Sequence, residues 1–284
     1  IDGGAVTNTG TMSICNNNDT PEGFTVKNGG VYRQSGKTDM KTKGGAAKII
    51  VANGGYYELA GQLAMGTGDD GCDDWKTASF IVSNATAKVA SIVAPGDVRY
   101  IASDYIRVLG DGGNKVAELE STGDIVVCAN SIAAANVRSK PTYLVVSNGI
   151  VKVGATLFTG DSDGVPAARS DAQNTVLVTG EKSKVEAKNL KANNRGKVKI
   201  VFPKSGFEAD ELIKVEQKAI LGANTTMELD VSNWRGGSQV VLQASEITGL
   251  TDDYKANRIT ITDSKQRQAK LKYLTEQKDD GSIK

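Results

Sequence analysis

Two aspartate-rich segments contain the residues best suited to bind a ligand. In the first, Asp161, Ser162, Asp163 and Gly164 alternate carboxylates with a glycine turn. Calcium takes about six to eight oxygen ligands, and such a segment supplies several of them from few residues. The complete calcium loop of helix–loop–helix proteins is not matched, because Ala172 stands where the closing acid would be. We therefore treat Asp161 and Asp163 as candidate calcium ligands.

The second acidic segment contains Asp69, Asp70, Asp73 and Asp74. Four carboxylates held close together repel one another, so an ordered cluster would favour a bound cation. These four residues complete the set of candidate calcium ligands. For both segments the ordinary alternative is a solvated turn, in which aspartate is common. No other cofactor is expected.

Catalysis would have to use carboxylates, because the sequence contains no histidine. This composition excludes Ser-His-Asp and Cys-His nucleophiles and every histidine general base. Asp97, Asp104 and Asp124 are candidate acids, but none belongs to a recognisable catalytic motif. Only 5% of the residues are aromatic, which leaves few to line a sugar-binding groove. We expect a non-catalytic protein, and a carboxylate-based polysaccharide lyase or hydrolase is the alternative.

The overall charge is nearly balanced, with 34 Lys and Arg against 33 Asp and Glu. This balance predicts no nucleic-acid partner, because such proteins carry a marked excess of positive charge. No apolar run approaches the roughly 20 residues of a membrane-spanning helix, so we expect no membrane insertion. The lysine-rich stretch 182–204 follows Glu181 directly and contains Glu186. It is expected to form a solvent-exposed face of mixed charge and not an anion-binding track.

The three cysteines, Cys15, Cys72 and Cys128, are almost evenly spaced along the chain. Even spacing would place them at one corner of a repeating fold, and three unrelated buried residues are the alternative. An odd number allows at most one disulfide within the chain. The sequence therefore does not describe a disulfide-stabilised scaffold, and which cysteines pair stays open.

A short repeated pattern dominates the organisation of the chain. It consists of three or four β-forming residues, a small polar residue, and then Asn-Gly or a close substitute. Val, Ile, Phe and Tyr favour a strand, while Asn and Gly tolerate the positive φ of a tight turn. A second strand is expected after each turn. The copies lie at 24–30, 49–55, 80–86, 125–131, 143–150, 175–181 and 198–204.

Asn-Gly between strands could also mark a simple hairpin. Hairpins, however, predict no long period, whereas most of these copies recur at intervals typical of coils that stack on one another. We therefore predict an all-β fold, a single right-handed parallel β-helix, or β-solenoid, with loop insertions. The segment 208–215 has partly helical spacing and is expected to be an insertion or a strand variant.

The repeated strand–Asn-Gly-Gly–strand pattern and the closing segments 238–242 and 247–249 resemble the passenger regions of autotransporter-like bacterial surface proteins. The resemblance covers residues 20–262 and lies in the pattern of the repeats. It implies a right-handed parallel β-helix exported to the bacterial cell surface. It implies no catalytic residues, and the sequence contains no C-terminal membrane barrel that would explain anchoring.

We expect three regions, a lead-in or cap at 1–23, solenoid repeats at 24–232, and terminal coils at 233–284, with the chain continuing further. The expected function is that of a non-catalytic, extracellular structural or adhesive rod on a bacterial surface. Its expected partners are further copies of the chain or glycans or proteins on host or neighbouring cells. The alternative is a self-assembling subunit of an extracellular filament or surface layer, since the end of a solenoid exposes unpaired strand edges.

Overall fold

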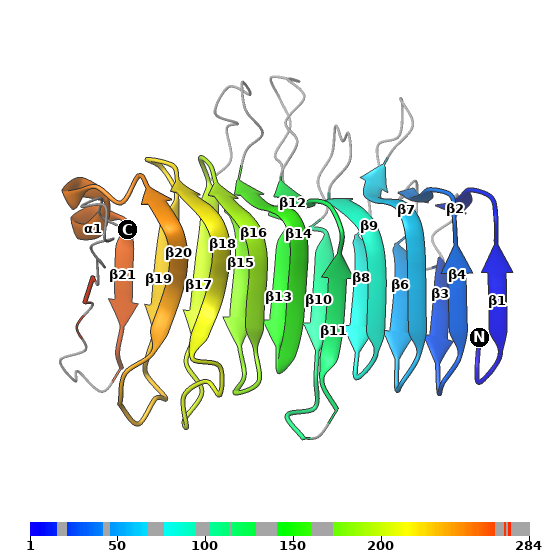
Figure 1. The fold of residues 1–284 in the computed structure, drawn as a ribbon, viewed down its shortest axis with the longest axis horizontal. Coiled ribbons are helices and arrows are strands. Elements are labelled where there is room, and N and C mark those ends of the chain that lie inside the picture. Colours follow the sequence, from blue (N-terminus) through cyan, green and yellow to red (C-terminus); the bar gives the residue numbers. More distant parts are fainter. Residues whose placement is uncertain are drawn as a thin grey trace.

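The computed structural model describes residues 1–15, 22–41, 46–67, 77–94, 103–113, 115–128, 141–160, 173–264, 270, 272 and 273. The chain winds into a parallel β-solenoid of about seven turns, with almost no helix. This confirms the predicted β-solenoid. Figure 1 shows the coils stacked along the longest axis of the molecule, with β1 (Ala5–Asn8) at one end and β21 (Ile259–Thr262) at the other.

Two parallel sheets form the long walls of the solenoid, and their strands run in opposite directions (Figure 1). Sheet A has nine strands. They are β3 (Glu22–Lys27), β6 (Ala47–Ala52), β8 (Ala78–Ser83), β10 (Tyr105–Leu109), β13 (Tyr143–Ser147), β15 (Asn174–Thr179), β17 (Gly196–Val201), β19 (Thr226–Asp230) and β21.

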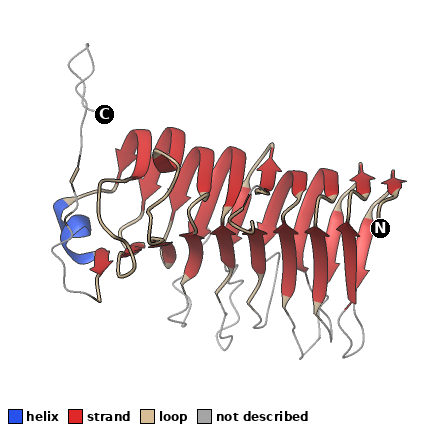
Figure 2. Ribbon diagram, turned by 90° about the horizontal axis from the view of Figure 1, so that it is seen from below, coloured by secondary structure: helices blue, strands red, loops and turns tan. Residues whose placement is uncertain are grey.

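Sheet B has twelve strands, some of which fill half of a coil. They are β1, β2 (Met12–Cys15), β4 (Val31–Gln34), β5 (Thr38–Lys41), β7 (Tyr56–Thr67), β9 (Thr86–Ala94), β11 (Ala117–Ser121), β12 (Ile125–Cys128), β14 (Gly149–Gly160), β16 (Lys184–Ala192), β18 (Glu211–Leu221) and β20 (Val240–Thr248). The one helix of the described residues, α1 (Asp252–Asn257), lies near the last strands, as Figure 2 shows.

Tight turns join the sheet A strands to the sheet B strands along one long edge of the molecule. Asn28, Asn53, Asn84 and Asn148 occupy these turns with φ between 49° and 53°. Asparagine tolerates this left-handed conformation better than most residues, which explains why it recurs there. The turns also bond to one another, since the Gly54 N–H donates to the Asn84 carbonyl over 2.7 Å. The predicted strand–Asn-Gly pattern is therefore a stack of equivalent turns.

The copy predicted at 125–131 differs from the other copies in its place in the fold. Residues 125–128 do form a strand, β12, but it pairs with β9 and β14 in sheet B. The sheet A strand of that coil is β10, whose turn is a longer glycine-rich segment that begins at Gly110. Within the segment 208–215, residues 211–215 form the start of β18, which agrees with the predicted strand variant.

Alternate residues of each strand point into one continuous hydrophobic core. Burial alternates along β6 and β10, and the core reaches from Ile14 near the first coil to Val231 near the last. Near the first coils the core contains a series of contacting rings, formed by Phe24, Tyr32, Tyr57 and Phe80. Later coils are filled mainly by Val, Ile, Leu and Ala. This shared core fixes which residues reach the two outer faces.

Candidate functional site

The outer face of sheet B displays a row of alternating charges. In each coil, one outward residue of sheet B lies directly beside the corresponding residue of the neighbouring strand. The row consists of Arg33, Glu58, Lys88, Glu120, Lys152, Glu186 and Lys214. We call this row the charge ladder. Opposite charges on adjacent strands attract one another, so the ladder favours the register that the structure adopts.

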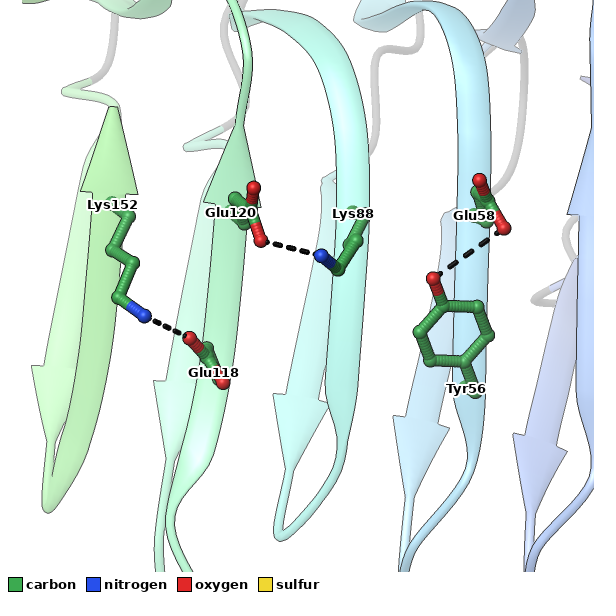
Figure 3. Close-up of polar contacts among 6 residues, drawn as sticks. All are labelled: Tyr56, Glu58, Lys88, Glu118, Glu120 and Lys152. Atoms are coloured by element: carbon green, nitrogen blue, oxygen red, sulfur yellow. Dashed lines mark hydrogen bonds and ion pairs between the residues drawn. The ribbon is translucent and has the colours of Figure 1, made fainter. Parts of the chain in front are cut away.

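Several neighbours in the charge ladder form ion pairs. Arg33 Nε lies 3.1 Å from Glu58 Oε2, and Lys88 Nζ lies 2.8 Å from Glu120 Oε2. Lys152 pairs diagonally, with its Nζ 2.6 Å from Oε1 of Glu118 on the neighbouring strand. Figure 3 shows these lysines reaching across to glutamates of the adjacent coil.

The hydrogen bonds of the charge ladder also shift its ionisation. The bond to Glu120 raises the pKa of Lys88 above its ordinary value, and the bond to Glu118 does the same for Lys152. The Tyr56 hydroxyl donates to Glu58 Oε2 over 3.4 Å, and partial burial raises the pKa of this tyrosine (Figure 3). The charged groups of sheet B are thus largely satisfied by one another.

The outer face of sheet A has a different composition. From β3 to β17 its outward positions include five cations and no Asp or Glu among the described residues; the cations are Lys27, Lys48, Arg107, Lys197 and Lys199. Acidic residues reach this face only on β19, at Glu228 and Asp230. We call the part from β3 to β17 the acid-free face.

Three of these five cations have ion-pair partners. Lys27 Nζ lies 3.2 Å from Asp2 Oδ2. Lys197 and Lys199 both pair with Glu228, whose pKa is lowered, chiefly by the hydrogen bond from Lys197. The lysine-rich stretch 182–204 is thus divided between the two sheets and does not form one face. In its sheet B part, Lys184 Nζ lies 2.8 Å from Glu186 Oε1.

Tyrosines and an arginine occupy the centre of the acid-free face. The rings of Tyr105 and Tyr143 stack with their centroids 5.2 Å apart and an angle of 7° between their planes. The guanidinium carbon of Arg107 lies 4.3 Å from the Tyr105 ring centroid. Partial burial raises the pKa of Tyr143. No carboxylate among the described residues forms an ion pair with Arg107 or Lys48.

A polar column lies inside the solenoid at the start of three sheet A strands. Asp104, Thr142 and Asn174 occupy equivalent positions, each one residue before or at the beginning of its strand. Asp104 Oδ1 accepts the N–H of Ala78 over 2.8 Å, and Asn174 Oδ1 accepts that of Thr142 over 3.0 Å. Burial raises the pKa of Asp104 to about 7. The Asp104 and Asn174 side chains thus bond one coil to the next, whereas the buried Thr142 hydroxyl has no partner among the described residues.

The two candidate acids that the structure describes, Asp104 and Asp124, lie in different environments. Asp104 lies inside the solenoid, 2% exposed, whereas Asp124 is exposed and its Oδ1 accepts the Thr156 N–H over 2.8 Å. Asp97 lies outside the described residues. The sequence could not predict that Asp104 is buried, because any polar residue before a strand has a similar sequence neighbourhood. Only the register between β10 and its neighbouring strands shows this position.

The six candidate calcium ligands, Asp69, Asp70, Asp73, Asp74, Asp161 and Asp163, lie outside the described residues, so calcium binding there stays a prediction. Within the described ranges, no group of three or more Cys, Asp or Glu side chains is arranged to hold a metal. Cys15 and Cys128 end β2 and β12, both in sheet B, and Cys72 is outside the described part.

The fold defines a class, that of parallel β-solenoid repeat proteins. Comparison with protein-family models, with curated proteins and with solved structures finds no match to this chain. Among the residues that the structure describes, no helix is long and apolar enough to cross a membrane.

Proposed function

We propose that the chain is a non-catalytic structural or adhesive rod displayed outside a bacterial cell, as part of an autotransporter-like surface protein. The observation that carries this proposal is the unbroken stacking of coils along one axis, with a continuous core and with β1 and β21 at opposite ends (Figures 1 and 2). Stacked coils that contact only their neighbours suit a rod that holds a surface away from the cell.

The charge ladder supports the same function. Its charged side chains pair between coils, so they stabilise the stack and are not gathered around a reaction centre. The charges of sheet B therefore largely pair with one another, whereas the outer face of sheet A has two cations, Lys48 and Arg107, without an acid partner among the described residues. An adhesive role requires one such surface that remains available to a partner.

Protease treatment of intact cells tests the location. Antibodies against the purified chain should label unbroken cells of the source bacterium, and an external protease should remove that signal. A cytoplasmic protein of the same cells, followed in the same samples, serves as the control for lysis. Protection of the chain until the cells are lysed would contradict surface display.

Self-assembly into a filament or layer is the second candidate function. Val6 is 44% exposed on β1 and Val240 is 42% exposed on β20, and these are the terminal strands of sheet B in the described chain. Strand edges with exposed apolar residues tend to pair with other edges. If the ends associate, light scattering after size exclusion should give a mass that rises with concentration.

A charged substitution at one end tests that association. Val240→Lys should prevent the rise in mass, because it places a cation on the terminal strand. Thr86→Lys introduces the same charge on a central strand of sheet B and is the matched control. A chain that stays monomeric at all concentrations would argue against the filament and leave the displayed rod.

A further inference from the structure

The acid-free face combines cations, aromatic rings and the absence of competing acids. A carboxylate-bearing ligand that approached it would meet Lys48 and Arg107, which have no ion-pair partner among the described residues. It would meet no carboxylate at the outward strand positions that the structure describes from β3 to β17. On sheet B the same ligand would meet glutamates at alternate coils of the charge ladder. Charge complementarity therefore favours sheet A for an anionic partner.

Arg107 is the residue best placed to bind the anion. Its guanidinium is held over the Tyr105 ring at 4.3 Å, and Tyr105 is itself fixed by stacking on Tyr143. A cation–π contact limits the freedom of the arginine without satisfying its N–H donors. A guanidinium donates two parallel hydrogen bonds to one carboxylate, so a partly fixed arginine without an acid partner suits that group.

The acid-free face also has a direction. One outward row runs along the axis of the solenoid through Lys48, Ser79, Tyr105, Tyr143, Thr175 and Lys197. Neighbouring strands lie about 4.8 Å apart, so the five steps from Lys48 to Lys197 span roughly 24 Å. The tyrosine pair lies at the centre of this row and a lysine lies at each end. An extended linear chain along the axis fits this order.

The face is less suited to a peptide than to a polysaccharide. Each sheet A strand from β6 to β17 is paired on both sides, so its backbone is not free to add a peptide strand. Nucleic acid places a phosphate at every nucleotide and is bound by dense clusters of cations. Here the two cations without an acid partner, Lys48 and Arg107, lie on strands separated by β8.

We propose that the acid-free face of sheet A binds a linear polysaccharide that carries carboxylates, of the polyuronate class, with Arg107 as the principal anion-binding residue. Tyr105 and Tyr143 would contact the sugar rings through their exposed edges and hydroxyl groups, and Lys48 would bind a second carboxylate. This inference deepens the proposed adhesive function and rests on it for its biological meaning. Its test needs only the purified chain.

Binding of purified chain to polygalacturonate, measured by isothermal titration calorimetry at low salt with EDTA present, tests the proposal. EDTA prevents a divalent cation from bridging the polymer to aspartate-rich loops. Arg107→Gln should weaken binding about tenfold, and Lys48→Gln should weaken it by a smaller factor. The matched control is Lys152→Gln, which removes one cation from the opposite wall and should leave the affinity unchanged.

Further polymers identify the chemical class. A neutral polysaccharide such as dextran should not bind, and poly-glutamate and dextran sulfate should bind more weakly than polygalacturonate. Equal losses from Arg107→Gln and Lys152→Gln would overturn the assignment to sheet A, and so would the absence of binding. Tighter binding of poly-glutamate or of dextran sulfate would overturn the polyuronate class. None of these outcomes depends on where the chain resides in the cell, so failure here is distinct from failure of the protease test.

Discussion

The two walls of this solenoid share one core but differ on their outer faces. On sheet B the charges alternate from coil to coil, and lysines pair with glutamates of the adjacent strand. On sheet A the outward positions from β3 to β17 contain no described acid, and apolar residues such as Ile81 and Val145 flank Arg107. The charges of sheet B thus hold neighbouring coils together, whereas two of the five cations on the acid-free face, Lys48 and Arg107, have no acid partner among the described residues.

The largest expected effects come from the core, where the two walls should not differ. Ile106 on β10 and Leu119 on β11 are both fully buried, one from each sheet. Replacing either with alanine leaves a cavity, and we expect each variant to lose about 2–5 kcal/mol of unfolding free energy. Urea denaturation followed by circular dichroism measures this loss. A loss confined to one of the two variants would show that the walls do not share a single core.

Asp104 offers the next largest effect and depends on pH. Burial raises its folded-state pKa from 3.8 to about 7, so folding favours the neutral carboxyl. The contribution of Asp104 to the unfolding free energy is fully present below pH 3.8, the pKa of the unfolded state. It is lost as the pH rises through about 7, the pKa of the folded state. Asp104→Asn keeps an oxygen to accept the Ala78 N–H, as Asn174 does for Thr142. We expect it to stabilise the fold at pH 8 by as much as roughly 4 kcal/mol and little at pH 4.

Urea unfolding at pH 4, 6 and 8 checks this expectation. Asp124→Asn is the control, because it removes an exposed carboxyl that also accepts a backbone N–H. The gain should grow with pH only in the Asp104 variant. If the gain at Asp104 were the same at every pH, the cost of a buried charge would not be its cause.

The fold could be predicted largely from local signals. A β-forming run followed by asparagine in a left-handed turn recurs at β3, β6, β8 and β13, and each is a strand with its turn in the expected place. The same signal failed at β10, because that strand is followed by a longer glycine-rich turn. The copy predicted at 125–131 does contain a strand, β12, but this strand belongs to sheet B.

The outer faces could not be predicted in this way. The partners in the charge ladder lie in different coils, and the number of residues between them varies from pair to pair because the connecting segments differ in length. No fixed sequence period therefore reveals that Lys88 meets Glu120. The same reason hides the acid-free face and the buried position of Asp104, since both require the register between strands. The aspartates predicted to bind calcium lie outside the described residues and stay a prediction.

Reversing one charge of the ladder should have a moderate effect. Lys152 has Glu120 and Glu186 as cross-strand neighbours and forms an ion pair with Glu118. Lys152→Glu would place like charges side by side, and we expect a loss of about 1 kcal/mol in low salt. High salt should reduce that loss, because it screens charges at the surface. Adding Glu118→Lys should restore part of the stability, and failure to do so would argue that the pair does not stabilise the stack.

The smallest change in unfolding free energy is expected when a lysine of sheet A is replaced with glutamate. Lys48→Glu changes a half-buried lysine whose cross-strand neighbours, Gly23 and Ser79, carry no charge. Because no described acid faces this position, we expect its unfolding free energy to change by less than about 0.5 kcal/mol, with little dependence on salt. Urea titrations in low and high salt, run in parallel with Lys152→Glu, make the comparison direct. A loss at Lys48 as large as that at Lys152 would mean that Lys48 also stabilises the stack, and it would remove the main reason to regard this lysine as available to a ligand.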